Sequence, residues 1–175
     1  MQAAGDIRLT PTSYIVLGLL DAAGEATPYE LKQAVAASVG NFWSLQHAQL
    51  YTEPERLARG GYLTEEREHT GRRRKRYRLT PAGRTALREW RATPAEGVPE
   101  LRDIGLLQLF FGADPVNLAQ ARLPGHRAKL AEYQAAARLD LPPGPRRALE
   151  SGIGHEREWV RFWSRLARDG RARRG

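Results

Sequence analysis

Residues 60–80 read GGYLTEEREHTGRRRKRYRLT, a sequence with the marks of a β-hairpin. Basic and apolar residues alternate from Arg76 to Leu79, which is the two-residue period of a half-buried strand. Gly71 supplies a turn signal because glycine tolerates a positive φ angle. We therefore predict two short strands around a turn, with basic residues concentrated at the turn and directly after it.

Helix starts are marked by capping residues placed directly before prolines. A hydroxyl or carboxylate at this position accepts a backbone N–H, and a proline in the first helical turn has no N–H to leave unpaired. Thr27 followed by Glu30 also fits the reciprocal capping box. The four pairs of this kind are Thr10–Pro11, Thr27–Pro28, Thr80–Pro81 and Asp114–Pro115.

The N-terminal part of the chain predicts three helices before the hairpin and one helix after it. The first should span residues 11–23, and it is apolar almost all round, as expected of a buried helix. The second should span residues 28–39, and the third residues 44–59 with Ser44 as its cap. Pro81 begins the fourth. This order is that of a winged helix-turn-helix with a two-stranded wing.

The third helix is the candidate recognition helix, because the major groove of DNA is wide enough to admit a helix. Glutamine and arginine can form paired hydrogen bonds to base edges, and glutamate can accept one from cytosine. The residues expected away from its core side are Gln46, His47, Gln49, Thr52, Glu53 and Arg56. The basic wing would contact phosphates, which position a protein without specifying sequence. The wing residues are Arg72, Arg73, Arg74, Lys75 and Arg76.

Residues 93–99 predict a linker between a DNA-binding domain at 1–92 and a wholly helical domain at 100–175. The chain as a whole is therefore predicted to be mainly α. In the second domain a dense apolar segment precedes two longer amphipathic patterns. The amphipathic patterns cover residues 115–140 and 146–167.

Apolar and aromatic residues in the helical domain form a stripe too wide to remain in water. Such a stripe can close an intrachain bundle or a homodimer seam; we favour the dimer because one winged helix reads only a short half-site. Aromatic side chains at helical spacing more often pack together than line a ligand pocket. The predicted dimer residues are Leu107, Phe110, Phe111, Leu130, Tyr133, Ile153, Trp159, Val160 and Trp163.

Charge and composition favour an anionic partner and exclude several other functions. The chain has 175 residues and a net charge of +8, without cysteine. It lacks a basic segment followed by an apolar one at its start, and its apolar runs are too short to cross a bilayer. We therefore expect a cytoplasmic protein with double-stranded DNA and itself as partners, and no membrane.

No enzymatic or metal-binding motif is visible. The histidines lie far apart without the spacing of metal ligands. Ser151 and His155 have neither a third triad member nor an oxyanion motif, and no phosphate-binding glycine loop is present. We expect no catalytic activity, no metal and no cofactor.

Several motifs taken in order resemble the PadR family of bacterial transcriptional regulators over nearly the whole chain. The motifs are SYIVLGLL at 13–20, TPYEL at 27–31, HAQLY at 47–51, GYL at 61–63, KRYRLTPAG at 75–83, LFF at 109–111 and WVRFW at 159–163. YRLTPAG alone would equally suit the MarR family; the order of all the motifs is more specific.

The resemblance implies a homodimeric DNA-binding regulator, usually a repressor acting on a palindromic operator and sometimes released by a small ligand, here unknown. It places the start of the third helix in the major groove and the wing on the backbone. The DNA-contact role so implied falls on Ser44, Gln46, His47, Gln49, Tyr51 and Thr52, and on Arg72, Arg73, Arg74, Lys75 and Arg76.

Two departures from the family pattern concern prolines. Thr52 follows Tyr51 where the family usually has proline, and Pro54 takes an aliphatic position. A proline inside a helix costs roughly 3 kcal/mol relative to alanine, so we expect a bend in the recognition helix. Pro124 with Gly125 should kink or break the helix that is normally continuous in the dimer region.

Other classes of function stay open at this point. A MarR-type regulator would keep the function and change only the dimer architecture. A winged-helix module that binds protein or RNA would use the wing to dock an acidic partner. The wing arginines could instead be a solvated charged loop, which is the weaker interpretation for five consecutive basic residues in a basic protein. The helical domain argues against an interaction module, because such a module has little need of a dimer seam.

Overall fold

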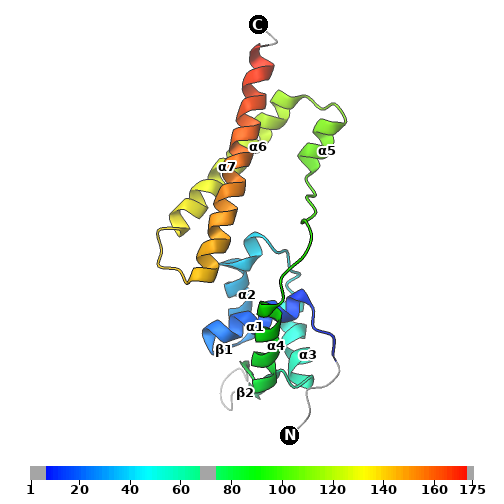
Figure 1. Ribbon diagram of the computed structural model, residues 1–175, viewed down its shortest axis with the longest axis vertical. Helices are drawn as coiled ribbons and strands as arrows, with labels where there is room; N and C mark the ends of the chain where they lie inside the picture. Colours follow the sequence, from blue (N-terminus) through cyan, green and yellow to red (C-terminus); the bar gives the residue numbers. More distant parts are fainter. Residues whose placement is uncertain (1–6, 68–73, 173–175) are drawn as a thin grey trace. The chain divides into compact units, whose positions relative to one another are not determined.

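A computed structural model describes residues 7–67 and 74–172 of the chain, with side chains as far as Arg168 (Figure 1). The chain forms two compact units that meet in sequence between Gly97 and Val98. Each unit has its own cluster of buried apolar residues. The two units are described separately below.

The first unit contains the predicted helices and the predicted hairpin in the predicted order. Its elements are α1 (Pro11–Ala23), β1 (Glu25–Ala26), α2 (Pro28–Ala36), the 3-10 turn η1 (Val39–Asn41), α3 (Gln49–Arg59), β2 (Leu63–Arg67), β3 (Lys75–Leu79) and α4 (Pro81–Ala92).

The caps predicted from the threonine–proline pairs are confirmed. Thr10, Thr27 and Thr80 are the N-caps of α1, α2 and α4, and each hydroxyl accepts the backbone N–H of the residue three positions later. The Thr27 capping box is complete, since the Glu30 carboxylate accepts the Thr27 N–H at 2.7 Å. Gly24 ends α1 at a φ of 79°, a backbone angle that favours glycine.

The sheet has a third strand that the sequence did not predict. The strand order is β1-β3-β2, and both pairings are antiparallel. β3 lies in the centre, with Tyr77 opposite Ala26 on one side and Glu65 on the other. β1 has two residues, and alternation cannot be recognised in so short a segment. The central strand therefore has hydrogen-bonded neighbours on both sides, and β1 ties the wing to the end of α1.

The core of the first unit lies between α1, α3 and the sheet. Val16, Leu17 and Leu20 of α1 are 0% exposed, as predicted for a helix apolar almost all round. Leu50 and Leu57 of α3 are equally buried. At about 25 cal/mol per Å² of apolar surface, burial of each such side chain contributes about 1.5–3 kcal/mol. The core therefore holds one side of α3 firmly against α1.

α2 is shorter than predicted. It ends at Ala36, and the chain then makes the 3-10 turn Val39–Asn41 rather than continuing the helix. The Ser38 hydroxyl donates a hydrogen bond to the Ala34 carbonyl oxygen at 2.6 Å. A serine side chain that bonds the backbone in this way competes with the helix, which explains the earlier end.

The second unit consists of three helices. They are α5 (Ile104–Phe110), α6 (Pro115–Ala136) and α7 (Pro143–Ala172). α6 and α7 lie side by side as an antiparallel pair (Figure 1). α7 begins three residues earlier than the predicted Arg146, because Pro143 and Pro145 fall in its first turn, where a missing N–H costs nothing.

Neither internal proline ends its helix. α6 runs from Pro115 to Ala136 through Pro124 and Gly125, so of the predicted kink or break the break is wrong. α3 likewise continues through Pro54, whose side chain is fully buried. A proline removes one hydrogen bond from a helix, and packing of the neighbouring turns against α7 and α1 keeps each helix whole.

The close packing of the start of α4 against the backbone of Gly61 and Tyr62 can be tested by substitution. Thr80 Oγ1 donates to the Gly61 carbonyl oxygen at 2.7 Å, and a Cβ added at Gly83 would lie 2.2 Å from the Tyr62 carbonyl oxygen. We expect Gly83→Ala to lower the free energy of unfolding by about 1–3 kcal/mol, because backbone must move to admit the methyl group. Urea unfolding measures the change.

Gly18→Ala is the matched control. A Cβ at this helical glycine meets nothing within 4 Å, so the same substitution should raise stability by about 0.5–1 kcal/mol. Equal effects at the two positions would contradict the packing of α4 against the Gly61–Tyr62 turn.

Candidate nucleic-acid interface

The entry to α3 differs from the sequence prediction. The helix begins at Gln49 with Ala48 as N-cap, and no side chain caps it there, so Ser44 is not its cap. The turn before the helix is closed by Gln49 itself, whose Oε1 accepts the Gln46 N–H at 3.2 Å. A glutamine bond of this kind has no distinctive spacing in a sequence, whereas serine is a common cap.

The start of α3 and the turn before it present polar side chains to solvent. Thr52 Oγ1 donates to the Ala48 carbonyl oxygen at 3.3 Å, and Tyr51 is 46% exposed. The predicted contact residues on this surface are all exposed, namely Ser44, Gln46, His47, Gln49, Tyr51 and Thr52. We call these residues the reading surface.

The opposite side of α3 is buried and includes a charged residue. Leu50, Pro54 and Leu57 pack into the core, as their apolar character suggests. Glu53 is 9% exposed, so its predicted place on the outward face is wrong. A glutamate at this depth needs partners, because burial of an unpaired carboxylate is costly.

A hydrogen-bonded network supplies these partners. Ser13 Oγ on α1 donates to Glu53 Oε1 at 2.6 Å. Arg56 binds both carboxylate oxygens, with Nη2 2.7 Å from Oε1 and Nε 2.8 Å from Oε2. The same guanidinium donates to Ser13 Oγ at 3.0 Å and to the Arg8 carbonyl oxygen at 3.2 Å. The network joins α3 to α1 and to the segment before it.

Arg56 is therefore engaged within the protein, and its contact with DNA stays a prediction. All of its described bonds point to the protein, and its side chain is only 32% exposed. Burial raises the pKa of Glu53, but the hydrogen bonds from Arg56 and Ser13 and the charge of Arg56 outweigh burial. The pKa consequently lies below its ordinary value of 4.5.

The wing is anchored by Tyr77, which is 0% exposed. Its hydroxyl donates to Glu65 Oε2 at 3.0 Å, and burial together with this carboxylate raises the pKa of Tyr77 far above the ordinary value. Leu79 is also buried, whereas Arg78 is exposed. The predicted alternation of β3 is thus confirmed.

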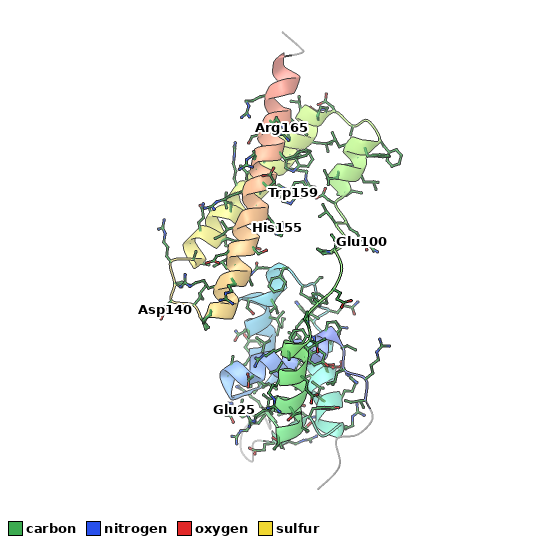
Figure 2. The ribbon with its side chains drawn as sticks, in the orientation of Figure 1. Glu25, Glu100, Asp140, His155, Trp159 and Arg165 are labelled. Atoms are coloured by element: carbon green, nitrogen blue, oxygen red, sulfur yellow. The ribbon has the colours of Figure 1, made fainter. Side chains whose placement is uncertain are left out.

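The basic residues at the wing base are paired with carboxylates. Lys75 binds Glu55 and Glu65, and Arg76 binds Glu25 at 3.1 Å. Arg78 Nε also donates to Glu25, labelled on β1 in Figure 2, at 2.6 Å. Sequence reasoning missed these carboxylates because Glu25 lies about fifty residues before its partners, beyond the reach of any local spacing rule.

The predicted wing contacts thus divide into three groups. Lys75 and Arg76 are engaged within the protein and are not simple free cations. Arg74 is exposed and lies directly before β3. Arg72 and Arg73 lie outside the described residues.

In the second unit, the predicted dimer residues on and after α5 face solvent. Leu107 is 52% exposed, Phe110 81% and Phe111 77%. The two phenylalanine rings form an edge-to-face pair with centroids 5.2 Å apart. Ile104 on the same helix is 64% exposed. Large apolar side chains gathered in this way are unusual on a monomer surface.

The predicted dimer residues on α7 mostly pack within the chain. Trp163 is 0% exposed and Ile153 8%, so neither is available to a partner in this conformation, which corrects both predictions. Trp159, labelled in Figure 2, and Val160 pack against the same buried cluster as Trp163. Leu130 and Tyr133 on α6 are half-buried. The α7 stripe therefore closes an intrachain bundle, the alternative less favoured from sequence.

Among the described residues, no three His, Asp or Glu side chains lie close enough together to hold a metal ion. None of the helices described is both long and apolar enough to cross a membrane.

Residues 16–89 match the model of the Transcriptional regulator PadR-like family. The Negative transcriptional regulator PadR of Bacillus subtilis is 30% identical over 131 residues, which cover 70% of this chain and 71% of that protein. The chain belongs to the PadR family of transcriptional regulators. This membership decides between the PadR and MarR resemblances, and it agrees with the expectation of a protein that is not an enzyme.

Solved PadR structures share this fold. Bacillus subtilis PadR in complex with operator DNA superposes with a TM-score of 0.79 at 25% identity, over 93% of this chain and 99% of that one. The complex of Bacillus subtilis PadR with p-coumaric acid gives a TM-score of 0.74 at 23% identity, over 90% and 98% of the two chains. These matches confirm the predicted winged-helix fold of this chain.

The Glu53 network predicts a specific response to acid. Because folding lowers the pKa of Glu53, the ionised carboxylate stabilises the native state fully above pH 4.5, and this stabilisation is lost as the pH falls through the folded-state value. We expect Glu53→Gln to cost about 1–3 kcal/mol at neutral pH and to flatten the acid dependence. Urea unfolding over a pH series measures both.

Glu66→Gln is the control, since Glu66 is 64% exposed and its carboxylate lies 3.8 Å from Arg78. It should leave neutral-pH stability nearly unchanged. A Glu53→Gln protein that loses stability with acid as steeply as the parent would contradict the network.

Proposed function

We propose that this chain is a homodimeric repressor that binds a palindromic operator through the reading surface of α3 and the basic wing. The observation that carries the proposal is the division of α3 into two sides. One side is fixed in the core, and the other presents glutamines at the helix start, where a winged helix meets base edges. The operator complex of the B. subtilis relative, with the same fold, supports this role.

The reading surface is suited to base recognition. The side-chain oxygen Oε1 of Gln49 accepts the Gln46 backbone N–H, which leaves the side-chain Nε2–H groups of Gln49 for an outside acceptor. Gln46 and Gln49 are both exposed on neighbouring positions at the same end of the helix. A glutamine amide can pair with adenine, and such pairs discriminate against a wrong base by about 1–3 kcal/mol.

Repression and dimerisation have separate support. The relative that is 30% identical is a negative regulator by name. A repressor that covers two half-sites needs two copies, and the exposed side chains Leu107, Phe110 and Phe111 offer an apolar surface for a second copy. Phosphate contacts in this scheme fall to the wing, with Arg74 the exposed basic residue nearest to β3.

Selection of bound duplexes from a random pool tests the proposed operator. We expect a palindrome with half-sites about one helical turn, or ~34–36 Å, apart. Enrichment of single, unpaired sites would contradict the two-copy arrangement.

Single substitutions on the reading surface should change the selected sequence. Gln46→Ala or Gln49→Ala should cost about 1–3 kcal/mol at one base position and relax the preference there, because a paired base contact is lost. Gln33→Ala is the control, since Gln33 is an exposed glutamine on α2 outside the reading surface. Titration against the selected operator and single-base variants of it measures the loss. An identical profile for all three proteins would contradict the assignment.

A charged substitution on α5 tests the proposed dimer surface. Phe110→Glu places a carboxylate on a side chain that is 81% exposed in the single chain, so it should not unfold the protein. It should weaken association by at least about 2 kcal/mol, because a charge would be buried at an apolar seam. Light scattering over a concentration series measures the shift towards monomer.

Leu139→Glu provides the matched control, since Leu139 is 61% exposed beyond the end of α6. It should leave the mass unchanged. A Phe110→Glu protein with the parent's association would remove α5 from the proposed seam.

A further inference from the structure

Lys75 at the start of β3 is held between two carboxylates from different elements. Its Nζ lies 2.5 Å from Glu55 Oε1 on α3 and 3.3 Å from Glu65 Oε1 on β2. The hydrogen bond from Lys75 to Glu55 is the main cause that raises the pKa of Lys75 above its ordinary value. The wing base is therefore joined by an ion pair to the helix that carries the reading surface.

The two carboxylates differ in how firmly they are held. Glu65 also accepts the Tyr77 hydroxyl at 3.0 Å and lies 3.3 Å from the Arg67 guanidinium, and its side chain is 23% exposed. Glu55 is 46% exposed and has Lys75 as its ion-pair partner. Glu65 is thus a structural acceptor for Tyr77, whereas Glu55 mainly neutralises Lys75.

The position of Glu55 relates this ion pair to the reading surface. Glu55 follows Tyr51 by four residues and Thr52 by three on α3, and residues at these spacings share one face of a helix. Both Tyr51 and Thr52 are exposed. Glu55 consequently lies where the face that carries the reading surface meets the wing base, so a phosphate that approached Lys75 there would also approach the Glu55 carboxylate.

We propose that Glu55 is an internal competitor of DNA phosphate for Lys75, and that it weakens the attraction of this protein for DNA of any sequence. With both carboxylates beside it, Lys75 adds no net positive charge to the wing base. A phosphate that approaches Lys75 therefore competes with the Glu55 carboxylate for the same ammonium group. The inference rests on the proposed DNA-binding function and adds a residue that limits affinity rather than supplying it.

Such a competitor would lower the phosphate contribution to the binding of every duplex. Non-specific binding depends almost wholly on phosphate contacts and counterion release. Neutralising one basic residue lowers that term, while base contacts at the reading surface keep their contribution in the operator complex. Arg74 stays an exposed basic residue directly before β3, and Glu55 reduces the positive charge of the wing base at Lys75.

The test measures binding of the full chain to a labelled duplex of arbitrary sequence between about 50 and 200 mM salt. We expect Glu55→Gln to bind severalfold more tightly and to steepen the slope of log affinity against log salt by about 0.9, the value for one added phosphate contact. Glu66→Gln removes the same charge from the wing, where Glu66 is 64% exposed, and it measures the effect of net charge alone.

A double substitution identifies Lys75 as the residue that Glu55 restrains. Glu55→Gln with Lys75→Gln should lose the whole gain, because no ammonium remains for the phosphate. Urea unfolding of each variant shows whether the fold is retained.

The outcomes separate this proposal from the function on which it rests. If Glu55→Gln binds no more tightly than Glu66→Gln, or more weakly than the parent because the pair holds the wing in place, the competitor role is overturned while DNA binding stands. A gain that persists in the double variant would also overturn it. A parent protein that binds neither this duplex nor any selected operator would overturn both proposals.

Discussion

The proposed interface depends on the hydrogen-bonded network of Ser13, Glu53 and Arg56. It joins the middle of α3 to the start of α1 within an otherwise apolar core. Burial of the apolar stripe of α3 selects the side that faces the core, and the paired carboxylate and guanidinium add directional hydrogen bonds that fix the helix in that position. Because that position turns Glu53 inward, the reading surface is turned outward.

The positive charges at the wing base are mostly paired with carboxylates of the same chain. The chain carries a net charge of +8, yet Lys75, Arg76 and Arg78 at the wing base each bind a carboxylate. Exposed ion pairs of this kind add little to stability, because water and salt screen them. These ion pairs have a greater effect on which positive charges remain available to a phosphate. In the described part of the wing, Arg74 is such a charge. In the second unit the apolar side chains divide in a similar way. Trp163 of α7 is buried within the chain, whereas Phe110 of α5 is exposed to solvent.

Much of the fold could be predicted because its signals are local. The threonine–proline pairs mark helix starts by chemistry that acts within one turn, and the alternation around Tyr77 reports burial of one face of a strand. The errors that concern buried and paired residues have one origin, which is contact between residues far apart in the chain. Glu53 and Arg56 look like solvent-facing residues in the sequence, because their partner Ser13 lies about forty residues away. β1 is equally invisible, since a strand of two residues exists only through its partner β3.

From the sequence by itself, the winged helix-turn-helix order, the location of its helix starts, the basic wing and the PadR resemblance all follow, because each depends on residues close together in the chain. Only the tertiary structure decided which charges are committed to the protein and which apolar residues are covered. Arg56 and Lys75 bind carboxylates, Trp163 is buried between helices, and Phe110 is left in solvent. The physical reason is that pairing and burial depend on neighbours in space, and a pattern along the chain carries no information about a neighbour on another element.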